Sequence, residues 1–460
     1  MKRTLQRFLN HKNGFCTAMF FCFMLVQFIV LRLGNQAGQG YLEVEQQEFV
    51  YFFLQCTVIV GWLLYVLIGV RIRNKKVYTA LLGTVTGLFA LCAQMMLFAP
   101  ANTPFYLALT GVTVLCLGVM LGAVYERLSA YIHAGAKAGY CIGIGYGAAV
   151  LLQYVLQLYL VFKPGLSLLL LISCAVLLLG FTAVPANEQS AREVSAHRVP
   201  PVPLVCSVLI AFALLMFSSY FNSLIHHLQI ATGYTDFNVY TWPRLLLIPG
   251  MLLFGFLGEV KGGKFLPVCA LCIAMIALLN SVLSAQSYHL NMCLYYISLA
   301  AAIAYYHLTF LRLAPRTKNP AVWAAMGRVS DSLMVMASFA LGLSRLSFTA
   351  VMVMNIAALV ICIVFMAVKG DFNLHFTGEQ SVKVQSEPAA DVFLDLQARY
   401  GITAAEMRVF RELVETEDKQ EAVAAKLGIS VSTLRHHITS IYKKTGVQTR
   451  AALYKLIQKS

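Results

Sequence analysis

Long apolar stretches fill the first 368 residues, whereas the residues after 395 alternate apolar and polar positions with the period of short helices. A helix needs about 20 mainly apolar residues to cross a bilayer. Twelve stretches are long enough, and we expect each to form one membrane-spanning helix. They cover residues 15–33, 49–70, 77–99, 104–125, 137–162, 165–184, 204–229, 242–258, 265–285, 291–311, 321–343 and 346–368.

Two polar stretches divide the chain. Residues 185–203 are rich in Pro and charged side chains, and they separate the sixth predicted span from the seventh. Residues 369–395 show little apolar periodicity, which is typical of a linker. The pattern predicts an all-α protein: a membrane domain at 1–368 with halves 1–184 and 204–368, a linker at 369–395, and a helical domain at 396–460.

The composition supports a membrane protein. Of 460 residues, 59% are hydrophobic and only 12% are charged, which excludes an ordinary soluble globular protein. Lys and Arg favour the cytoplasmic side of a membrane. With the N-terminus inside, the inner segments hold seventeen Lys and Arg and the outer ones four. We therefore expect a multi-pass protein of the cell membrane whose N-terminus, central loop, linker and C-terminal domain are cytoplasmic.

The twelve cysteines all lie in the apolar part of the chain, where Cys behaves as a small hydrophobic residue. Cys269 and Cys272 are spaced as C-x-x-C, but they lie within a predicted apolar helix. We expect no disulfide framework, no metal and no cofactor. The sequence also shows no phosphate-binding loop, paired catalytic carboxylates or nucleophile–base pair, so we expect no enzyme.

Four helices are predicted in the C-terminal domain. Thr403 and Glu406 have the spacing of a capping box, and Asp418 and Glu421 repeat it. Gly428 is suited to end the second helix, because glycine adopts the left-handed conformation without strain. The third helix starts at the N-cap Ser430 and the fourth after Thr449. The residues expected in the core include Met407, Phe410, Leu413, Leu427, Leu434, Ile438, Ile441, Leu453 and Leu456.

Two helices joined by a short turn containing glycine indicate a helix-turn-helix. The third helix would place donors for base edges and phosphates on its open face: Ser432, Arg435, His436, Thr439 and Lys443. From Ala422 onward the chain has seven Lys and Arg and no Asp or Glu, which suits a polyanionic partner. The alternative is a small helical bundle with a solvated basic face.

The sequence of this domain resembles the LuxR-type helix-turn-helix family. The resemblance rests on the spacing of Ser430, Thr433, Arg435, His437, Ile441, Lys444, Gly446, Val447 and Arg450, and upstream on Ile402, Thr403, Glu406 and Val409. It implies that Arg435, His436 and Thr439 face the major groove of promoter DNA. It gives Thr433, His437 and Lys444 backbone and framework roles. It implies that the fourth helix, through Leu453 and Leu456, pairs two copies on DNA. RNA polymerase is an expected further partner.

The two sets of six spans resemble the major facilitator superfamily, in which two helical bundles enclose a central cavity. Gly255, Leu257, Glu259, Gly262 and Lys264 are spaced like that superfamily's loop signature, with Glu259 in place of an Asp. The first-half position, residues 71–76, keeps basic residues but lacks the Gly and the acid.

Ionisable groups within spans are costly and are candidate sites. Arg328 and Asp331 are one turn apart in the eleventh span, and we expect an ion pair that serves either as packing or as a switch or ligand contact. We expect Arg244, at the outer start of the eighth span, to reach the membrane surface. The resemblance implies that spans one, four, seven and ten line the cavity. Candidate ligand contacts there are Gln27, Tyr220, Asn222, His226, Tyr295 and Tyr296.

The leading hypothesis is a membrane-bound one-component transcriptional regulator. Its transporter-like body would sense a small molecule or a membrane state and control DNA binding by the C-terminal domain. The second hypothesis is a major-facilitator-type transporter that carries a regulatory head. A third is a head used only for pairing with another protein, which the basic open face of the third helix disfavours.

Overall fold

The structure is a computed structural model. It describes residues 11–36, 44–72, 74–100, 103–133, 135–159, 163–182, 205–217, 242–283, 287–317, 319–342, 346–369, 396–397, 399–415, 420–447, 449 and 453. The chain divides into two compact units, Met1–Thr377 and Gly378–Ser460, which are described separately. The central loop, most of the linker, Tyr220, Asn222, His226, Asp418 and Leu456 lie outside the described residues.

In the first unit, here called the body, the described residues form helices joined by short turns. Its α-helices are α2 (His11–Gln36), α3 (Val44–Leu67), α4 (Lys75–Phe98), α5 (Pro104–His133), α6 (Ala138–Tyr159), α7 (Lys163–Thr182), α10 (Leu247–Glu259), α11 (Leu266–Leu283), α12 (Tyr288–Leu313), α13 (Pro320–Ala340) and α14 (Phe348–Lys369). A further helix covers Val205–Phe217. Short 3-10 turns are η1 (Gly69–Arg71), η3 (Trp242–Leu246), η4 (Val260–Gly263) and η5 (Ala314–Arg316).

Each predicted span contains a helix where it is described, although the seventh, 204–229, is described only over 205–217. Not all of these helices meet the requirements for crossing a membrane. Nine helices in the described part are long and apolar enough. Val205–Phe217 and the apolar part of α14, Thr349–Phe365, are shorter. The helix α13 is 21 residues long but carries Arg328 and Asp331, which make it more polar than the nine. These helices are those of a multi-pass membrane protein.

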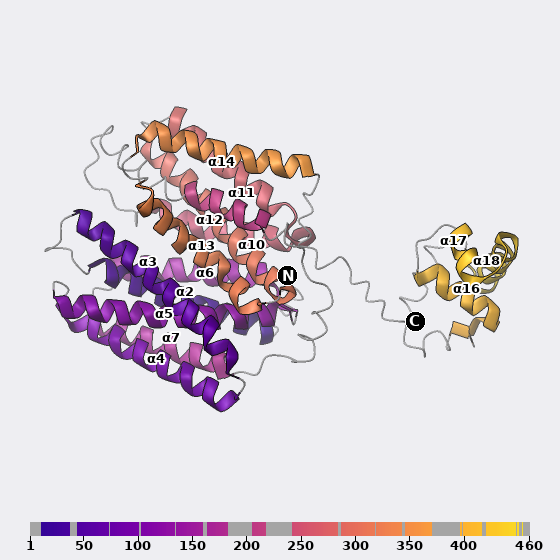
Figure 1. Cartoon of the computed structure of the whole chain (residues 1–460), viewed down its shortest axis with the longest axis horizontal. Helices are drawn as coiled ribbons and strands as arrows, with labels where there is room; N and C mark the ends of the chain where they lie inside the picture. Colours follow the sequence, from indigo (N-terminus) through magenta and orange to yellow (C-terminus); the bar gives the residue numbers. More distant parts are fainter. Residues whose placement is uncertain are drawn as a thin grey trace. The chain divides into compact units, whose positions relative to one another are not determined.

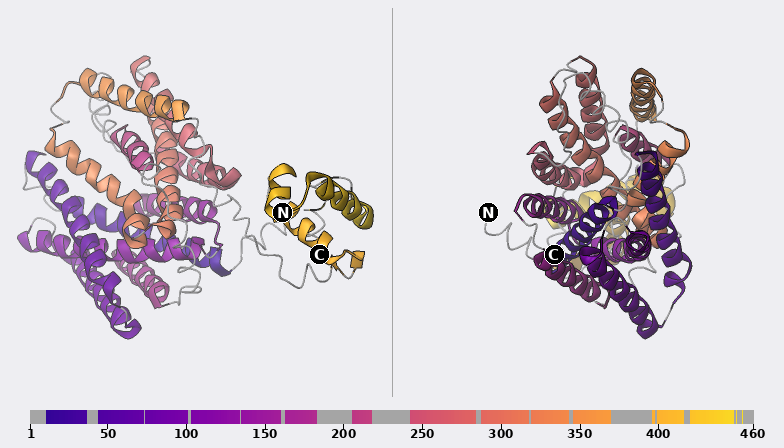
Figure 2. Two further views of the ribbon diagram at one scale, coloured as in Figure 1. Left: turned by 45° about the vertical axis from the view of Figure 1, so that its right-hand side comes forward. Right: turned by 90° about the vertical axis from the view of Figure 1, so that its left-hand side faces the viewer.

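The helices of the body fall into an outer set and an inner set. Figure 1 shows α4, α5 and α7 side by side at one edge and α11 with α14 at the other, and these neighbours are in contact. Between them lie α2, α6, α10, α12 and α13. The turned views of Figure 2 again show purple helices of the first half at one edge of the body and the orange α14 at the other. Because α6 packs along α10 and α13 packs against α3 and α5, the two predicted halves meet through these helices.

Glycines allow the closest approaches between helices. On α3 and α5, a Cβ at Gly61 would overlap with the carbonyl of Leu115, and one at Gly118 would overlap with the carbonyl of Val58. The pair Gly139 on α6 and Gly255 on α10 behaves in the same way. Small residues at such crossings bring helix backbones close together, and this close packing is a main source of helix association in membranes.

The second unit, here called the head, contains α16 (Ala404–Glu415), α17 (Gln420–Leu427) and α18 (Val431–Thr445). These helices enclose a core formed by Leu396, Ile402, Met407, Val409, Phe410, Leu413, Val423, Ala424, Leu434, Ile438, Ile441 and Leu453. Of the predicted fourth helix, Leu453 is described, and it is helical and buried. Because Leu453 is buried in the core of its own head, its side chain is not available to pair two heads in this structure. The pairing role of Leu456 stays a prediction.

The predicted helix ends of the head are confirmed where they are described. The N–H of Thr403 donates to Glu406 Oε2 (2.7 Å), and the N–H of Glu406 donates to Thr403 Oγ1 (3.3 Å), which is a capping box. Ser430 is the N-cap of α18 and accepts from the N–H of Thr433 (3.1 Å). Gly428 has a φ of 66°, as a glycine that ends a helix should.

Candidate functional site

The head presents one polar face on α18. Ser432, Arg435, His436, Thr439 and Lys443 are all exposed, while Leu434, Ile438 and Ile441 on the opposite face are buried. This division follows from the helical spacing, since residues three and four apart lie on the same side. The structure therefore places the five predicted donors on one accessible surface of one helix.

Arg435 is held at this surface by α17. Its Nε donates to Oε1 of Gln420 (3.1 Å), at the start of α17. The hydroxyl of Thr439 donates to the carbonyl of Arg435 (2.9 Å), so its proton is engaged within α18. No local pattern in the sequence indicates Gln420, because it is fifteen residues away from Arg435.

The remaining predicted DNA-binding residues serve the framework of the head in this structure. The hydroxyls of Ser430 and Thr433 contact each other at the N-cap (2.7 Å), and His437 is half-buried. Lys444 donates to Oε2 of Glu406 (2.6 Å), so it ties α18 to α16. Oε1 of the same carboxylate accepts from Ser440 (2.5 Å).

Glu406 is therefore the main polar link in the head. Desolvation raises its pKa, but the hydrogen bonds from Lys444, Ser440 and Thr403 outweigh this effect and lower the pKa to about 2. Hydrogen bonds to the ionised form favour ionisation. The sequence analysis identified Glu406 only as a capping residue, because its partners on α18 are far away in the chain.

The body contains a polar cluster where α13 meets α2. Arg328 on α13 donates through Nη1 to the carboxylate of Asp331, one turn away, so the predicted ion pair is confirmed. With its amide oxygen facing α13, Gln27 on α2 accepts from Nη2 (2.8 Å) and Nε (2.7 Å) of Arg328. The amide oxygen of Gln27, a predicted ligand contact, is therefore already bound to Arg328. The two partners differ in burial, because the side chain of Arg328 is 7% exposed and that of Asp331 is 36% exposed.

Further polar contacts surround this cluster. Ser332, next to Asp331, donates to Oε1 of Gln55 on α3 (2.8 Å). Tyr125 on α5 contacts Nδ1 of His307 on α12 (3.1 Å between the two atoms). Tyr295, a predicted ligand contact, is buried on α12, where it packs against Phe217 and Tyr296.

The expectation that Arg244 reaches the membrane surface is wrong. Its Nη2 donates to Oε1 of Gln153 on α6 (2.7 Å), and its guanidinium lies over the ring of Phe28 on α2 (5.8 Å to the centroid). A hydrogen-bond acceptor and an aromatic face within the body thus replace the headgroups that the sequence analysis expected.

Glu259 joins three helices at the end of α10. Its Oε1 accepts from Nη2 of Arg312 on α12 (2.7 Å) and from the N–H of Gly139 at the start of α6 (2.6 Å). Nη1 of Arg312 also donates to the carbonyl of Gly258 (2.7 Å). The acid of the loop signature thus links α10 to the N-terminus of α6, where the helix dipole favours a negative charge.

A second carboxylate, Glu126 on α5, links helices in the first half of the body. Tyr65 on α3 donates to Oε2 of Glu126 on α5, and its hydroxyl also contacts that of Tyr78 on α4 (3.0 Å). The guanidinium of Arg127 lies over the ring of Tyr78 (5.4 Å to the centroid). The sequence analysis missed this link, because Tyr65 and Glu126 are 61 residues apart.

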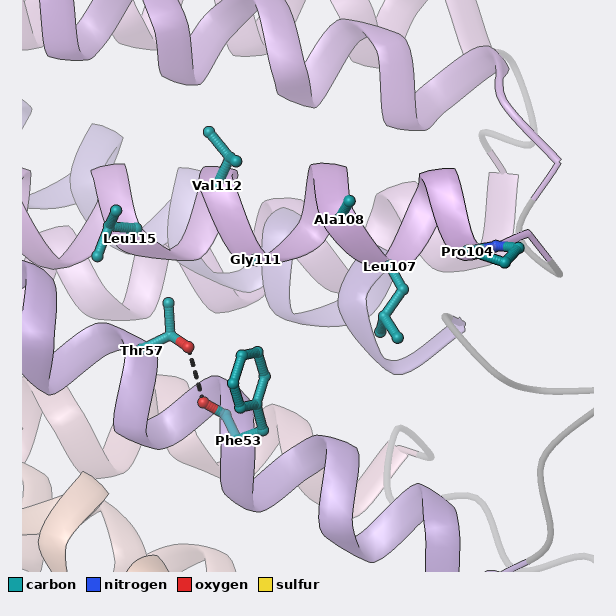
Figure 3. Close-up of a pocket in the computed structure, with 8 residues that line it drawn as sticks. All are labelled: Phe53, Thr57, Pro104, Leu107, Ala108, Gly111, Val112 and Leu115. Atoms are coloured by element: carbon teal, nitrogen blue, oxygen red, sulfur yellow. Dashed lines mark hydrogen bonds between the residues drawn. The ribbon is translucent and has the colours of Figure 1, made fainter.

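An apolar groove of about 490 Å³ lies between α3 and α5. Figure 3 shows Phe53 and Thr57 of α3 pointing toward α5, from which Leu107 and Leu115 contribute to the lining. The hydroxyl of Thr57 donates to the carbonyl of Phe53 (2.8 Å), so it is satisfied within α3. The groove thus offers little for recognition of a polar ligand. No group of three or more His, Cys, Asp or Glu among the described residues could hold a metal ion.

Comparisons with known proteins leave the family open. No protein-family model matches the chain, and no curated protein matches it. Among solved structures, the body is similar to the human organic anion transporter MFSD10, with a TM-score of 0.47 and 13% identity over 80% of this chain and 98% of that one. It is also similar to an auto-inhibited peptide transporter of the POT family, with a TM-score of 0.44 and 12% identity over 80% of this chain and 96% of that one.

Proposed function

We propose that this chain is a membrane-bound transcriptional regulator whose head binds promoter DNA and whose body responds to a small molecule. The observation that carries the proposal is the exposed face of α18, with Arg435, His436, Thr439 and Lys443 on one side. Arg435, His436 and Lys443 supply donors for base edges and phosphates, and the hydroxyl oxygen of Thr439 can accept a hydrogen bond. No Asp or Glu follows Ala422 to oppose a polyanion. An anchored head of this kind would act on DNA at the inner membrane surface.

The proposed control is a shift between two states of the body. A ligand changes such a balance only through different affinities for the two states. The links that would differ between states are the Arg328–Asp331 and Glu259–Arg312 pairs, since both belong to helices that join the two halves. In this scheme two heads pair on DNA through the fourth helix, where Leu456 is the predicted contact, and contact RNA polymerase.

The test is DNA selection with the intact protein in detergent, starting from fragments of the source genome. We expect enrichment of a small set of promoter fragments, lost when Arg435 and Lys443 are both changed to Ala. The matched control is a double change of Lys455 and Lys459 to Ala, which removes the same charge from beyond α18. Enrichment that survives the α18 change, or no enrichment at all, would contradict the proposal.

The second candidate function is small-molecule transport by a body that carries a regulatory head. The observation that favours it is the Arg328–Asp331 pair at the contact between the halves, where transporters place their substrate sites. The similar solved structures are transporters, but at TM-scores below 0.5 their likeness does not choose between the two functions. Uptake into vesicles containing the purified protein, abolished by Asp331→Asn, would favour transport.

A further inference from the structure

Arg328 is a buried cation that makes hydrogen bonds to residues on two different helices. Its side chain is 7% exposed, and it makes hydrogen bonds to Asp331 on its own helix and to Gln27 on α2. A guanidinium has five N–H donors in one plane, and such a group binds a carboxylate in a bidentate manner. Three hydrogen bonds are described for Arg328, so part of its donor capacity remains available to another acceptor.

Asp331 is accessible, although it lies near the middle of α13 (Pro320–Ala340). Its side chain is 36% exposed, about five times the fraction of its partner. An ionised carboxylate in a membrane helix is very costly against lipid, so such groups face the bundle interior or a water-filled cavity. Asp331 is therefore the accessible member of the pair, and Arg328 is the buried member.

Buried aromatic side chains of α5 and α12 lie near the pair. Tyr306 on α12 packs against Gly327, next to Arg328, and the hydroxyl of Tyr125 on α5 lies 3.1 Å from Nδ1 of His307 on α12. All three side chains are buried, and Nε2 of His307 makes no hydrogen bond to a described residue. The pair is therefore close to aromatic groups from both halves.

The opposite charges of Arg328 and Asp331 favour some classes of ligand over others. A simple anion at Arg328 would leave Asp331 as an uncompensated carboxylate, and a simple cation at Asp331 would leave Arg328 buried without a counter-ion. Removing one partner of a buried pair is strongly unfavourable. A ligand with both charges gives each residue a new partner. An uncharged ligand replaces neither of them.

We propose that the Arg328–Asp331 pair is the ligand site of the body, and that it binds a small zwitterion of the α-amino-acid type. The carboxylate of the ligand meets Arg328 and its ammonium meets Asp331, while the tyrosines contact its side chain. The proposal rests on the proposed function only in naming what the body senses. It would serve a transporter equally well.

The test measures ligand binding to the full-length protein in detergent by the shift of its thermal unfolding midpoint, followed by tryptophan fluorescence. The probes are the standard α-amino acids, each also as its N-acetyl derivative, which lacks the cation, and as its amide, which lacks the anion. We expect at least one free amino acid to bind at least tenfold more tightly than both of its derivatives.

Three variants locate the site. In Asp331→Asn, the preference for the free amino acid over its N-acetyl derivative should fall to less than about threefold. In Arg328→Lys, which keeps the charge but not the planar donors, the preference over the amide should fall in the same way. Glu259→Gln breaks the Glu259–Arg312 pair and should keep both preferences, even if it lowers the midpoint.

Several outcomes would overturn the proposal. These are an N-acetyl derivative or an amide that binds as tightly as the free amino acid, a preference that survives Asp331→Asn, or a folded protein whose midpoint no amino acid shifts at millimolar concentration. Failure here is distinguishable from failure of the proposed function, because promoter selection depends on the face of α18 and needs no amino acid. A protein that selects promoters but binds no zwitterion would refute only this inference.

Discussion

Two arginines show how burial decides what the same side chain can do. Arg435 is exposed on α18 and held by a neutral amide, Gln420, so it keeps its charge available for a partner outside the chain. Arg328 is buried and held by Asp331 and Gln27, so its charge is balanced within the body. The first arrangement suits DNA, whereas the second suits a small ligand that can compete with Asp331.

Changing Arg435 to Ala is expected to reduce specific DNA binding more than non-specific binding. A bidentate contact with a base is worth about 1–3 kcal/mol of discrimination. Lys443→Ala should instead weaken binding to all sequences alike and flatten the salt dependence, because a phosphate contact carries no sequence information. To compare the two variants, the affinity of each intact protein is measured over a salt series for a selected promoter and for a scrambled sequence. Equal loss on both DNAs for Arg435→Ala would reject base reading.

The head is expected to lose stability in acid through Glu406. Its pKa of about 2 in the folded head lies below the ordinary value of 4.5, so its stabilising effect is present above about pH 4.5 and is lost as the pH falls toward 2. Because solvent screens such links, we expect the loss to be about 1 kcal/mol. Thermal unfolding of segment 396–460 at pH 7 and pH 3 measures it. Glu406→Gln should be less stable at pH 7 but less sensitive to acid, and the exposed Glu421→Gln should behave like the parent.

At the scale of elements, close helix crossings depend on single glycines. The backbones of α3 and α5 meet where Gly61 faces Gly118, and those of α6 and α10 meet where Gly139 faces Gly255. The second crossing also carries the hydrogen bond from the N–H of Gly139 to Glu259. A crossing can therefore fix both the distance between two helices and the position of a charged group.

Gly118→Ala is expected to destabilise the body by about 1–3 kcal/mol, since the new methyl group overlaps with the backbone of Val58 and the helices must separate. Gly111→Ala, on the same helix α5, is the control, because a Cβ there meets nothing within 4 Å. The thermal midpoints of both variants in detergent measure the difference. Similar midpoints for the two would show that the crossing tolerates a wider spacing.

At the scale of the whole molecule, the chain joins a body with one large apolar core and a head with its own small core. The body exposes many large apolar side chains, such as Leu179 and Leu283, which suit contact with lipid. The helices α16 and α18 of the head are amphipathic, with polar residues outward, which suits water. The surface of the body thus suits lipid, and the surface of the head suits water.

The segment 396–460 is expected to fold without the body, because Leu396 and Leu453 at its ends are both buried in its core. Its core is small, so its stability should be marginal. Circular dichroism and thermal unfolding of the purified segment test this. A shorter segment, 404–460, removes Leu396, Ile402 and the Thr403 cap, and should be clearly less stable. An unfolded 396–460 segment would contradict the domain boundary.

The sequence by itself determined the helical class, the positions of the spans and the helix ends in the head. Apolar runs, the capping box of Thr403 and Glu406, the N-cap Ser430 and the ion pair of Arg328 with Asp331 all involve residues that are close in the chain. Backbone geometry alone brings such residues together, so their contacts follow from spacing. The apolar part of some helices is shorter than expected.

The tertiary structure alone decided which distant groups meet. Gln27 with Arg328, Glu126 with Tyr65, Arg244 with Gln153 and Lys444 with Glu406 each join separate helices. Which helices cross, and with what rotation, depends on the close packing of many side chains and on glycines such as Gly118, and no local pattern encodes it. A buried polar group must find a partner, and the fold determines which partner is within reach.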